Sequence, residues 1–430
     1  MRPVRHSGEL LPDSHVNKLN LPFETRTGAS PETPSSSSGS SLFKIRDVRG
    51  VVVNAGMRNW IFVKVETNDP ELFGWGEASM EWKTRSVAAA IEDLKVFIIG
   101  DDPTRIEHIY QKLYRQPFFR SGAIAQTAIS GIEQACWDIA GKVLGVPVYR
   151  LLGGKVRDRV RMYTHLGGGE IQSVYESFDS SRMVDLAHRV IAEGYTAIKV
   201  VCVPYSESLM GPSTVKKFAE NIGRLRAAIG NHVDLMVDFH GRTYPAMAIA
   251  YINAIAEYSP FFCEEPVPPE NLQALADVRK AVQVPIATGE RLTSRHQFRE
   301  VFETRAAHII QPDLCHCGGL LEAKKIASVA EMYYMGVAPH NPLGPVANAA
   351  ALHFGLSTPN FVIQEDMLSD VPWRWDIVES SLRVVDGYWQ TPEAPGLGVS
   401  VNEKAAENYP FQQEPLQSVV YAPDGAVLDW

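Results

Sequence analysis

The sequence predicts an α/β protein whose larger part is a closed βα barrel, preceded by a smaller domain of antiparallel strands and helices. Two patterns carry this prediction. Beyond residue 159, eight short apolar runs alternate with amphipathic stretches, and near-continuously apolar runs are typical of strands that helices cover on both faces. Residues 43–78 instead alternate β-branched and aromatic residues between turn signals, as antiparallel strands do. The length of 430 residues suits two domains or one large barrel with an attached cap.

The smaller domain is expected over residues 42–158. Its β-rich runs come first, and stretches with helical spacing follow, the last of them ending at Gly145 and Pro147. Before it, residues 1–41 are rich in Ser and Pro and cannot offset their ordering entropy by burial, which predicts a flexible leader. The expected strands are residues 43–53, 59–67 and 72–78, and the expected helices are residues 86–99, 105–114 and 123–144.

The barrel is expected over residues 159–366. Eight strand-like runs with helices between them fit a closed barrel better than an open doubly wound sheet. No G-x-G-x-x-G pattern follows a strand-like run and no P-loop pattern occurs, which argues against dinucleotide and nucleoside triphosphate binding. The expected strands are residues 160–165, 195–203, 233–240, 261–266, 284–290, 306–313, 335–340 and 361–366, with amphipathic stretches at residues 215–229, 247–258, 272–281 and 321–335.

The composition excludes several classes of protein. With 45% hydrophobic and 21% charged residues the chain is ordinary for a globular protein, and its net charge of −9 offers no basic footprint to nucleic acid or an anionic membrane. No run of roughly 18 apolar residues could span a membrane, and we expect no export signal. The five cysteines are sparse and mostly lie in apolar runs, which predicts reduced thiols and a cytoplasmic location.

Six of the strand-like runs of the barrel end in an acid or a histidine. Successive ends are about 25 residues apart, close to the length of one βα unit. If each unit takes one step around the ring, these side chains emerge together at the C-terminal mouth, where barrel enzymes keep their sites. The six residues are Asp238, Glu264, Glu290, Asp313, His340 and Glu365.

Asp238, Glu264 and Glu290 come from consecutive units and predict a metal site. Carboxylates brought within hydrogen-bond distance would raise one another's pKa unless a cation neutralised them. Ligation by oxygen alone suits a hard cation with open positions, so we expect Mg²⁺ before Zn²⁺, with Mn²⁺ as an alternative. The competing interpretation is that each acid caps the helix that follows it.

Asp313 and His340, on adjacent units, predict a general base. A carboxylate that accepts a hydrogen bond from one imidazole nitrogen fixes the tautomer and raises the basicity of the other nitrogen. His240 lies two residues beyond Asp238, and alternate residues of a strand share a face, so we expect it at the same mouth as a general acid. A hydrogen-bonded structural role is the alternative for such a histidine.

Two further features are less specific. Lys199 ends the second barrel run, where its amine would support an anion or act as a base, or would instead extend along the surface to water. Cys315, His316 and Cys317 are spaced too tightly for one tetrahedral metal site, so we interpret them as packing and loop.

Taken together, these residues make the chain resemble the enolase superfamily, within it the mandelate racemase-like group, and most closely the galactonate dehydratases. The likeness runs from about Phe43 to Val385, and the motifs are specific as a set rather than singly. The matching segments are GWGE at residues 74–77, SGIEQACWDIAGKVLGVPVYRLLGG at 130–154, DFHGR at 238–242, CEEPV at 263–267, GERL at 289–292, QPDLCHCGG at 311–319 and APHNPLGP at 338–345.

This resemblance implies a modified TIM barrel, (β/α)7β, under an α+β capping domain that residues 367–430 complete. It also implies one Mg²⁺ per subunit and a role for each residue that matches a family motif. These residues are Asp238, Glu264 and Glu290 as metal ligands, Asp313 and His340 as the base, His240 as the acid, and Glu365, Lys199 and Arg291 in substrate binding.

The implied activity is that of a hydro-lyase acting on a sugar acid, with a galactonate-type substrate favoured. The base would take the C2 proton and the acid would help to expel the C3 hydroxyl as water, giving a 2-keto-3-deoxy acid. The racemases carry a Lys-x-Lys base on the second barrel strand, whereas here Lys199 is followed by Val200 and Val201, which argues against racemisation.

Alternatives to this activity are a cycloisomerase or epimerase of the same superfamily and, from another class, a non-catalytic binding or structural barrel. We expect loops of the capping domain at residues 54–60, 79–84 and 117–122 to read the distal hydroxyls of the substrate. We also expect a homo-oligomer, a dimer or an octamer, with neither nucleic acid nor a membrane as a partner.

Overall fold

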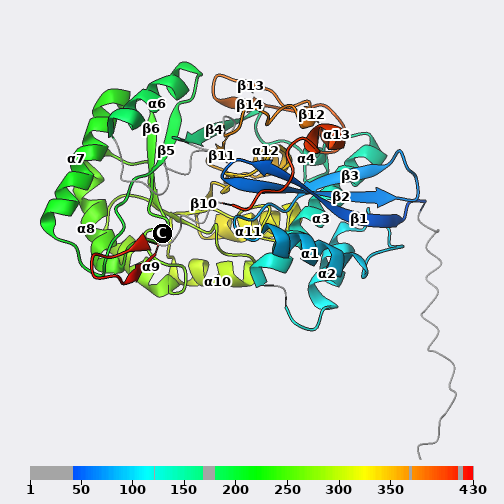
Figure 1. The fold of residues 1–430 in the computed structure, drawn as a ribbon, viewed down its shortest axis with the longest axis horizontal. Helices are drawn as coiled ribbons and strands as arrows, with labels where there is room; N and C mark the ends of the chain where they lie inside the picture. The colour runs from blue at the N-terminus through cyan, green and yellow to red at the C-terminus, as the bar shows by residue number, and fades with distance from the viewer. Residues whose placement is uncertain (1–41, 121, 168–179, 368–369, 415–419, 430) are drawn as a thin grey trace, which may run out of the picture. The chain divides into compact units, whose positions relative to one another are not determined.

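The computed structural model describes residues 42–120, 122–167, 180–367, 370–414 and 420–429, and Figure 1 shows its fold. Residues 1–41 are a unit separate from the rest of the chain and lie outside the described residues, so the flexible leader stays a prediction. Among the described residues, no helix combines the length and the apolar character needed to cross a membrane.

A three-stranded antiparallel sheet opens the described chain. A tight turn joins its first two strands, and Gly56 in this turn has a φ of 74°, a left-handed conformation that glycine adopts without strain. The strands are rich in Val, Ile, Phe and Trp, which suit a pleated surface, and the second strand is the one buried along most of its length. In spatial order they are β1 (Ile45–Ala55), β2 (Arg58–Thr67) and β3 (Phe73–Glu77).

Three helices pack on one face of this sheet, and the other face joins the core shared with the barrel. The longest helix lies very close to β3, because a Cβ atom added at Gly74 or Gly76 would stand 2.0 Å from a backbone oxygen of that helix. Glycine at these two positions of the GWGE motif is therefore what permits the contact. The helices are α1 (Thr84–Lys95), α2 (Ile106–Arg115) and α3 (Gly122–Leu144).

Eight parallel strands form the barrel. From β4 to β10 each strand pairs with the next strand in the chain, and the ring closes because β11 pairs with β4 while Val337 bridges Phe361. A layer of eight buried side chains, one from each strand or its direct extension, fills the interior. The strands are β4 (Arg159–His165), β5 (Ala197–Val201), β6 (Asp234–Asp238), β7 (Phe262–Glu264), β8 (Ile286–Thr288), β9 (Ile309–Ile310), β10 (Gly336–Val337) and β11 (Gln364–Asp366).

In the described chain, seven helices of the barrel lie between consecutive strands, and none separates β11 from the C-terminal strands. This is the expected (β/α)7β arrangement, drawn in green to orange in Figure 1. The helices are α6 (Ser180–Ala192), α7 (Pro212–Ile229), α8 (Pro245–Ile255) continued by η1 (Ala256–Tyr258), α9 (Leu272–Ala281), α10 (Arg295–Thr304), α11 (Leu320–Met332) and α12 (Pro345–Ser357), and the short α4 (Val148–Leu151) precedes the barrel.

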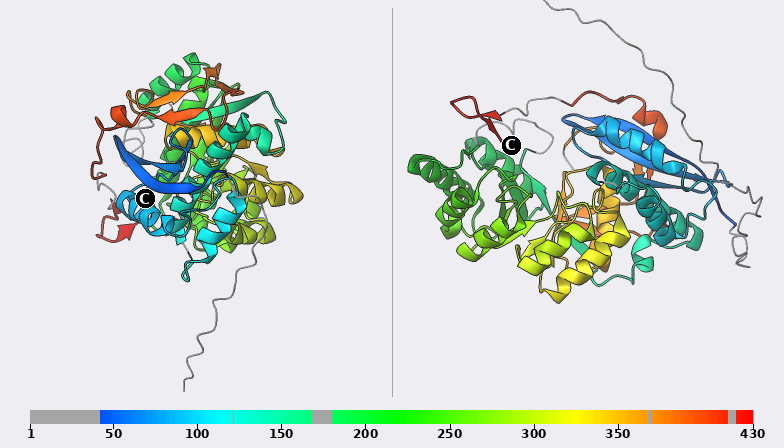
Figure 2. Two further views of the ribbon diagram at one scale, coloured as in Figure 1. Left: turned by 90° about the vertical axis from the view of Figure 1, so that its right-hand side faces the viewer. Right: turned by 90° about the horizontal axis from the view of Figure 1, so that it is seen from below.

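Residues 403–412, in the orange-red part of Figure 2, lie against the first sheet, whereas the red hairpin at residues 420–428 lies beside residues 206–209 of the barrel. Glu403 forms ion pairs with Arg49 of β1 and with Lys64 of β2, the latter at 2.7 Å. Asn59 donates a hydrogen bond of 2.8 Å to the carbonyl of Gln412 and accepts one of 3.2 Å from the amide of Gln412. The boundaries of the three expected domains stay a prediction. The C-terminal elements are β12 (Val378–Ser380), β13 (Val384–Val385), β14 (Tyr388–Gln390), β15 (Val399–Val401), α13 (Glu403–Ala406), β16 (Val420–Tyr421) and β17 (Val427–Leu428).

Candidate active site and metal centre

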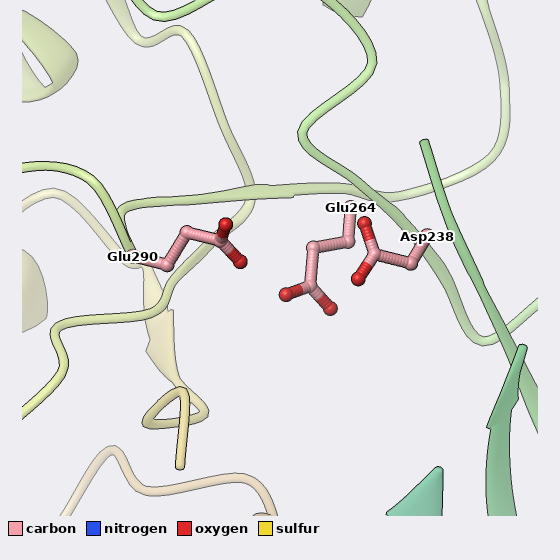
Figure 3. Close-up of side chains that lie close together, drawn as sticks. All are labelled: Asp238, Glu264 and Glu290. Atoms are coloured by element: carbon pink, nitrogen blue, oxygen red, sulfur yellow. The ribbon is translucent and has the colours of Figure 1, made fainter. Parts of the chain in front are cut away.

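Three carboxylates meet at the C-terminal end of neighbouring barrel strands. Asp238 ends β6, Glu264 ends β7 directly beside it, and Glu290 lies two residues beyond β8. One oxygen from each side chain lies within 4.8 Å of the other two, and Figure 3 shows the three groups side by side. The parallel register of adjacent strands therefore brings together residues that are about 25 positions apart in the chain.

A buried lysine on β5 lies against this cluster. The Nζ atom of Lys199 stands 3.0 Å from both carboxylate oxygens of Glu264, 3.3 Å from Asp238 and 2.7 Å from Glu365. With only 2% of its surface exposed, Lys199 does not extend along the surface to water, so that alternative is wrong. One ammonium group faces more than one carboxylate, which leaves the cluster with excess negative charge.

The carboxyl pKa values reflect this excess. Burial raises the pKa of Glu290 to about 7 and holds that of Glu264 well above its ordinary value, while the charges of His240 and Lys199 outweigh burial and lower the pKa of Asp238. The Oε2 atom of Glu290 is buried and makes no hydrogen bond within the described part of the chain. An oxygen-only donor set with surplus negative charge fits a hard cation.

His340 and Asp313 form the expected pair. The Nδ1 atom of His340 lies 2.7 Å from Oδ2 of Asp313, and the other oxygen of Asp313 accepts a hydrogen bond of 2.7 Å from the amide of Cys315. The Nε2 atom of His340 lies 3.5 Å from Glu290. Burial acts to lower the pKa of His340, but the charges of Glu290 and Asp313 outweigh it and raise this pKa to about 10. A cation at the carboxylates would offset the charge of Glu290 and so reduce this elevation.

His240 reaches the cluster, though not by strand alternation. β6 ends at Asp238, and His240 has a φ of 51°, a left-handed conformation in the turn after the strand. Its backbone amide donates a hydrogen bond of 2.9 Å to Asp238, and its Nε2 atom lies 3.5 Å from the other oxygen of that carboxylate. Burial lowers the pKa of His240 to about 3. His240 therefore lies at the expected mouth, but the strand-alternation argument for it is wrong, and its role as an acid stays a prediction.

The two remaining candidate residues, Glu365 and Arg291, lie near the carboxylate cluster, and each already pairs with an opposite charge. Glu365 accepts hydrogen bonds from Lys199 and, at 3.0 Å, from the amide of Asn341. Arg291 donates two hydrogen bonds to Glu265, at 3.0 and 2.6 Å. Both Glu365 and Arg291 line the cavity described next, so each presents its remaining surface to that space.

A cavity of about 460 Å³ joins these residues to the capping domain. From the barrel it is lined by the two histidines, Glu290 and the candidates just described, and from the capping domain by Met57, Arg58 and residues 80–83. Two of the three expected loops, residues 54–60 and 79–84, thus contribute to the wall. From the third, residues 117–120 and 122 are not among the lining side chains, residue 121 lies outside the described residues, and Ala123 just beyond it does line the cavity.

The wall also contains residues that were not named individually as candidates from the sequence. One of them, Arg58, belongs to the expected loop at residues 54–60, is buried and pairs with Glu81 at 3.1 Å. His165 ends β4, beside Lys199, and meets the same strand-end criterion that found the six other residues. His316, interpreted as packing, lines the cavity and lies 3.0 Å from Thr127 of α3, whereas the two flanking cysteines are buried as expected.

Models of known protein families match both the N-terminal and the C-terminal part of the chain. The model for the N-terminal domain of mandelate racemase / muconate lactonizing enzyme matches residues 47–153, and the model described as enolase C-terminal domain-like matches residues 182–405. The D-galactonate dehydratase of Ralstonia nicotianae is 39% identical over 381 residues, and that of Xanthomonas oryzae pv. oryzae (strain PXO99A) is 38% identical over 386 residues. Each alignment covers 86% of this chain and 96% of the relative.

Solved structures share the fold. A mandelate racemase/muconate lactonizing enzyme-like protein from Roseovarius sp. TM1035 superposes with a TM-score of 0.81 at 37% identity, covering 89% of this chain and 99% of that chain. An enolase from Agrobacterium radiobacter, bound to Na and L-malate, superposes with a TM-score of 0.82 at 33% identity, covering 90% of this chain and 100% of that chain. These similarities extend over the sheet domain and the barrel alike.

Proposed function

We propose a function from one premise: the chain belongs to the mandelate racemase/muconate lactonizing enzyme family of the enolase superfamily. We infer that it is a hydro-lyase that removes water from a sugar acid, the activity for which its D-galactonate dehydratase relatives are named. The observation that carries the proposal is the cluster of three carboxylates, one of which, Glu290, lines a cavity together with His240 and His340.

Asp238, Glu264 and Glu290 would hold one Mg²⁺, with Mn²⁺ as the alternative. The donor set supports this choice, since it contains carboxylate oxygens and no thiolate or imidazole. When bound there, the cation would supply positive charge that stabilises the charge developing on the substrate carboxylate as the neighbouring C–H bond breaks. The Na and L-malate of the Agrobacterium radiobacter enolase supply a precedent for a hard cation and a hydroxy acid in this fold.

His340 would take the C2 proton through Nε2. Its Nδ1 atom bonds to Asp313, so the tautomer that carries a proton on Nδ1 and a lone pair on Nε2 is the one that the pair favours. Asp313 does not touch the substrate, and its part is to orient the ring and to stabilise the imidazolium that forms. This assignment matches the pairing of the strand ends of β9 and β10.

His240 would complete the reaction as the acid. The C3 hydroxyl is a poor leaving group, so it departs as water only when a proton from His240 is added to it. The C2–H bond and the C3–O bond break, a C2–C3 double bond forms, and the resulting enol tautomerises to a 2-keto-3-deoxy acid. His240 borders the cavity from the turn after β6, and His340 borders it with its Nε2 atom 3.5 Å from Glu290.

Substrate binding would involve Lys199, Arg291 and Glu365 near the reacting end, and the loops of the capping domain at the distal end. Arg58, paired with Glu81, offers hydrogen-bond donors and acceptors to a polyhydroxylated chain. Such a wall suits an aldonate of the galactonate type. Val201, two residues after Lys199, lines the cavity where the racemases carry their second lysine, which favours dehydration over racemisation.

The proposal is tested by incubating the chelator-treated protein with Mg²⁺ and a panel of sugar acids that includes galactonate, gluconate, arabinonate and a diacid. The expected result is a 2-keto-3-deoxy acid from a galactonate-type substrate, formed only when Mg²⁺ or Mn²⁺ is present and abolished by E290Q. Turnover without a keto acid would instead indicate a cycloisomerase or epimerase. No turnover of any acid, together with no Mg²⁺ binding by calorimetry, would indicate a non-catalytic barrel.

The homo-oligomeric state and the cytoplasmic location stay predictions. Size-exclusion chromatography with light scattering tests the first, and fractionation of the source cells tests the second. Neither result bears on the assignment of the reaction.

A further inference from the structure

The barrel loops that carry the base are each held by a buried carboxylate of the capping domain. Asp313 lies in the loop between β9 and α11, and His340 lies in the loop between β10 and α12, each three residues after its strand. We propose that Glu133 and Glu77 of the capping domain are positioning residues, which fix these two loops and thereby set the contact between Asp313 and His340. The proposal deepens the dehydratase assignment and rests on it for the chemistry of the pair.

Glu133 lies in α3 and binds the start of α11. Its Oε2 accepts a hydrogen bond of 2.8 Å from the amide of Leu320, and its Oε1 accepts one of 2.9 Å from the amide of Leu321. The indole of Trp137, one turn along α3, donates a third hydrogen bond of 2.7 Å to Oε1. The first amides of a helix lack partners within the helix, so a carboxylate at this place satisfies them and interacts favourably with the helix dipole.

The same face of α3 forms two more hydrogen bonds with the loop before α11. The side-chain amide of Gln134 donates a hydrogen bond of 3.0 Å to the carbonyl of Leu314, the residue after Asp313. The hydroxyl of Ser130 accepts one of 2.9 Å from the amide of Gly318. Contacts from one helix therefore hold the loop at Leu314 and at Gly318, on either side of its centre.

Glu77, the last residue of β3, does the same for the second loop. Its Oε1 accepts a hydrogen bond of 2.7 Å from the amide of Gly344, and its Oε2 accepts one of 2.8 Å from the amide of Ala347, both at the start of α12. The hydroxyl of Ser79 donates a further hydrogen bond of 2.6 Å to Oε1. Figure 1 shows α3 and β3 beside the yellow and orange helices α11 and α12 that these residues bind.

The loops are shaped to admit these two carboxylates. A Cβ atom added at Gly319 would stand 2.0 Å from Oε2 of Glu133, and one added at Gly344 would stand 2.5 Å from Oε1 of Glu77. Glycine thus leaves space for the acid in each loop. Both acids are almost fully buried, and burial raises the pKa of Glu133 to about 8 and that of Glu77 above its ordinary value. Burying an acid costs free energy. Each of these two acids nevertheless contacts the backbone of a loop that carries Asp313 or His340.

Positioning by the capping domain has a chemical consequence. A general base acts only when its nitrogen stands at the right distance from the proton, and a displacement of about 1 Å lowers the rate by roughly 100-fold. Removing one anchoring oxygen would let the loop shift relative to its neighbour without changing any group that touches the substrate. The expected defect is therefore in turnover rather than in binding.

Asp138 provides a matched control for the test. It is a fully buried acid on the same helix, and it accepts hydrogen bonds of 3.0 Å from the amide of Trp75 and 2.8 Å from that of Leu397. Neither partner belongs to the loops of the base. D138N should therefore destabilise the capping domain as E133Q and E77Q do, without moving Asp313 or His340.

The experiment compares E133Q, E77Q and D138N with the wild-type enzyme loaded with Mg²⁺. We expect kcat to fall about 10- to 100-fold in E133Q and in E77Q, with KM and the Kd for Mg²⁺ within about twofold of wild type, and D138N to keep its kcat at a similar loss of Tm. Amide hydrogen exchange should rise over residues 313–321 in E133Q and over residues 340–347 in E77Q, and in neither segment in D138N.

Two results would overturn the inference. One is a loss of kcat in D138N as large as in the glutamine variants, and the other is unchanged hydrogen exchange in both loops. Should the wild-type protein convert no sugar acid, the dehydratase assignment fails, while hydrogen exchange still decides whether Glu133 and Glu77 hold the loops.

Discussion

Nδ1 of His340 lies 2.7 Å from Oδ2 of Asp313, and the two residues follow adjacent barrel strands, β9 and β10. Because Asp313 is buried and accepts this hydrogen bond as an anion, it both orients the ring and favours the imidazolium form. The adjacency of two strands thus brings the proposed base and its carboxylate partner together from positions 27 apart in the chain.

Replacing Asp313 by Asn tests the orienting role. D313N keeps the shape of the side chain but removes the charge, so kcat for dehydration should fall roughly 100-fold or more while KM changes little. Steady-state assays of the keto acid product measure both constants. Wild-type turnover in D313N would show that His340 does not depend on this partner.

Replacing each histidine separately distinguishes the base from the acid. H240N should still exchange the C2 hydrogen of the substrate with solvent deuterium but form no keto acid, because proton removal does not need the acid. H340N should lose both exchange and dehydration. Proton NMR of the substrate in D2O follows the exchange, and retained exchange in H340N with none in H240N would reverse the two roles.

Replacing Lys199 by Met tests the charge balance of the cluster. Without its ammonium group Glu264 and Glu365 lose a buried partner, which costs about 3–5 kcal/mol and should lower Tm in metal-free buffer. Added Mg²⁺ should then raise Tm more in K199M than in wild type, because the cation replaces the missing charge. Differential scanning fluorimetry with and without Mg²⁺ measures the difference.

A lysine on the surface serves as the control for that measurement. Lys216 pairs with Glu220 at 3.8 Å, and its side chain is 80% exposed. Exposed pairs contribute about 0–1 kcal/mol, so K216M should match wild type in both buffers. Equal responses of K199M and wild type to Mg²⁺ would mean that Lys199 does not compensate the carboxylates.

His353 should make the protein less stable in mild acid. Its Nδ1 accepts a hydrogen bond of 3.1 Å from the amide of Tyr149, and burial lowers its pKa from 6.5 to about 4. Between these values the unfolded chain binds the proton and the folded chain does not, so the stabilisation is complete above pH 6.5 and is lost as the pH falls towards 4.

The titration of His353 lowers the free energy of unfolding by roughly 3 kcal/mol over this pH range. Urea unfolding at several pH values should give H353Q a shallower decline of unfolding free energy than wild type. The exposed His232 provides the control, since H232Q should keep the wild-type slope. An unchanged slope in H353Q would assign the acid sensitivity to other groups.

The barrel was predictable because its strands are apolar whereas the loops around them are polar. Apolar runs such as residues 233–240 are short, regularly spaced and enclosed by polar loops, and the observed β6 lies within that run. α12 was missed because all thirteen of its residues are buried, so it has no solvent face and shows no amphipathic period. Periodicity identifies a helix only where one side of it meets water.

The cluster of three carboxylates was predictable for a similar reason, since a spacing of one βα unit places strand ends at one mouth. The same criterion would have found His165, which ends β4. Arg58 was expected only as a member of the loop at residues 54–60 and not singly, because its contact with the carbonyl of Pro342 in the barrel carries no local pattern. His240 was placed correctly although the chain turns left-handed there, a conformation that residue spacing does not reveal.

Arg49 and Glu403 stand 354 positions apart, yet they meet on the first sheet. A ribosome that adds roughly 5–20 residues per second therefore releases that sheet tens of seconds before its last partners exist. During this interval the contacts of the first sheet with α13 and with Gln412 cannot form. The set of contacts around that sheet is therefore complete only after the C-terminal segment has been translated.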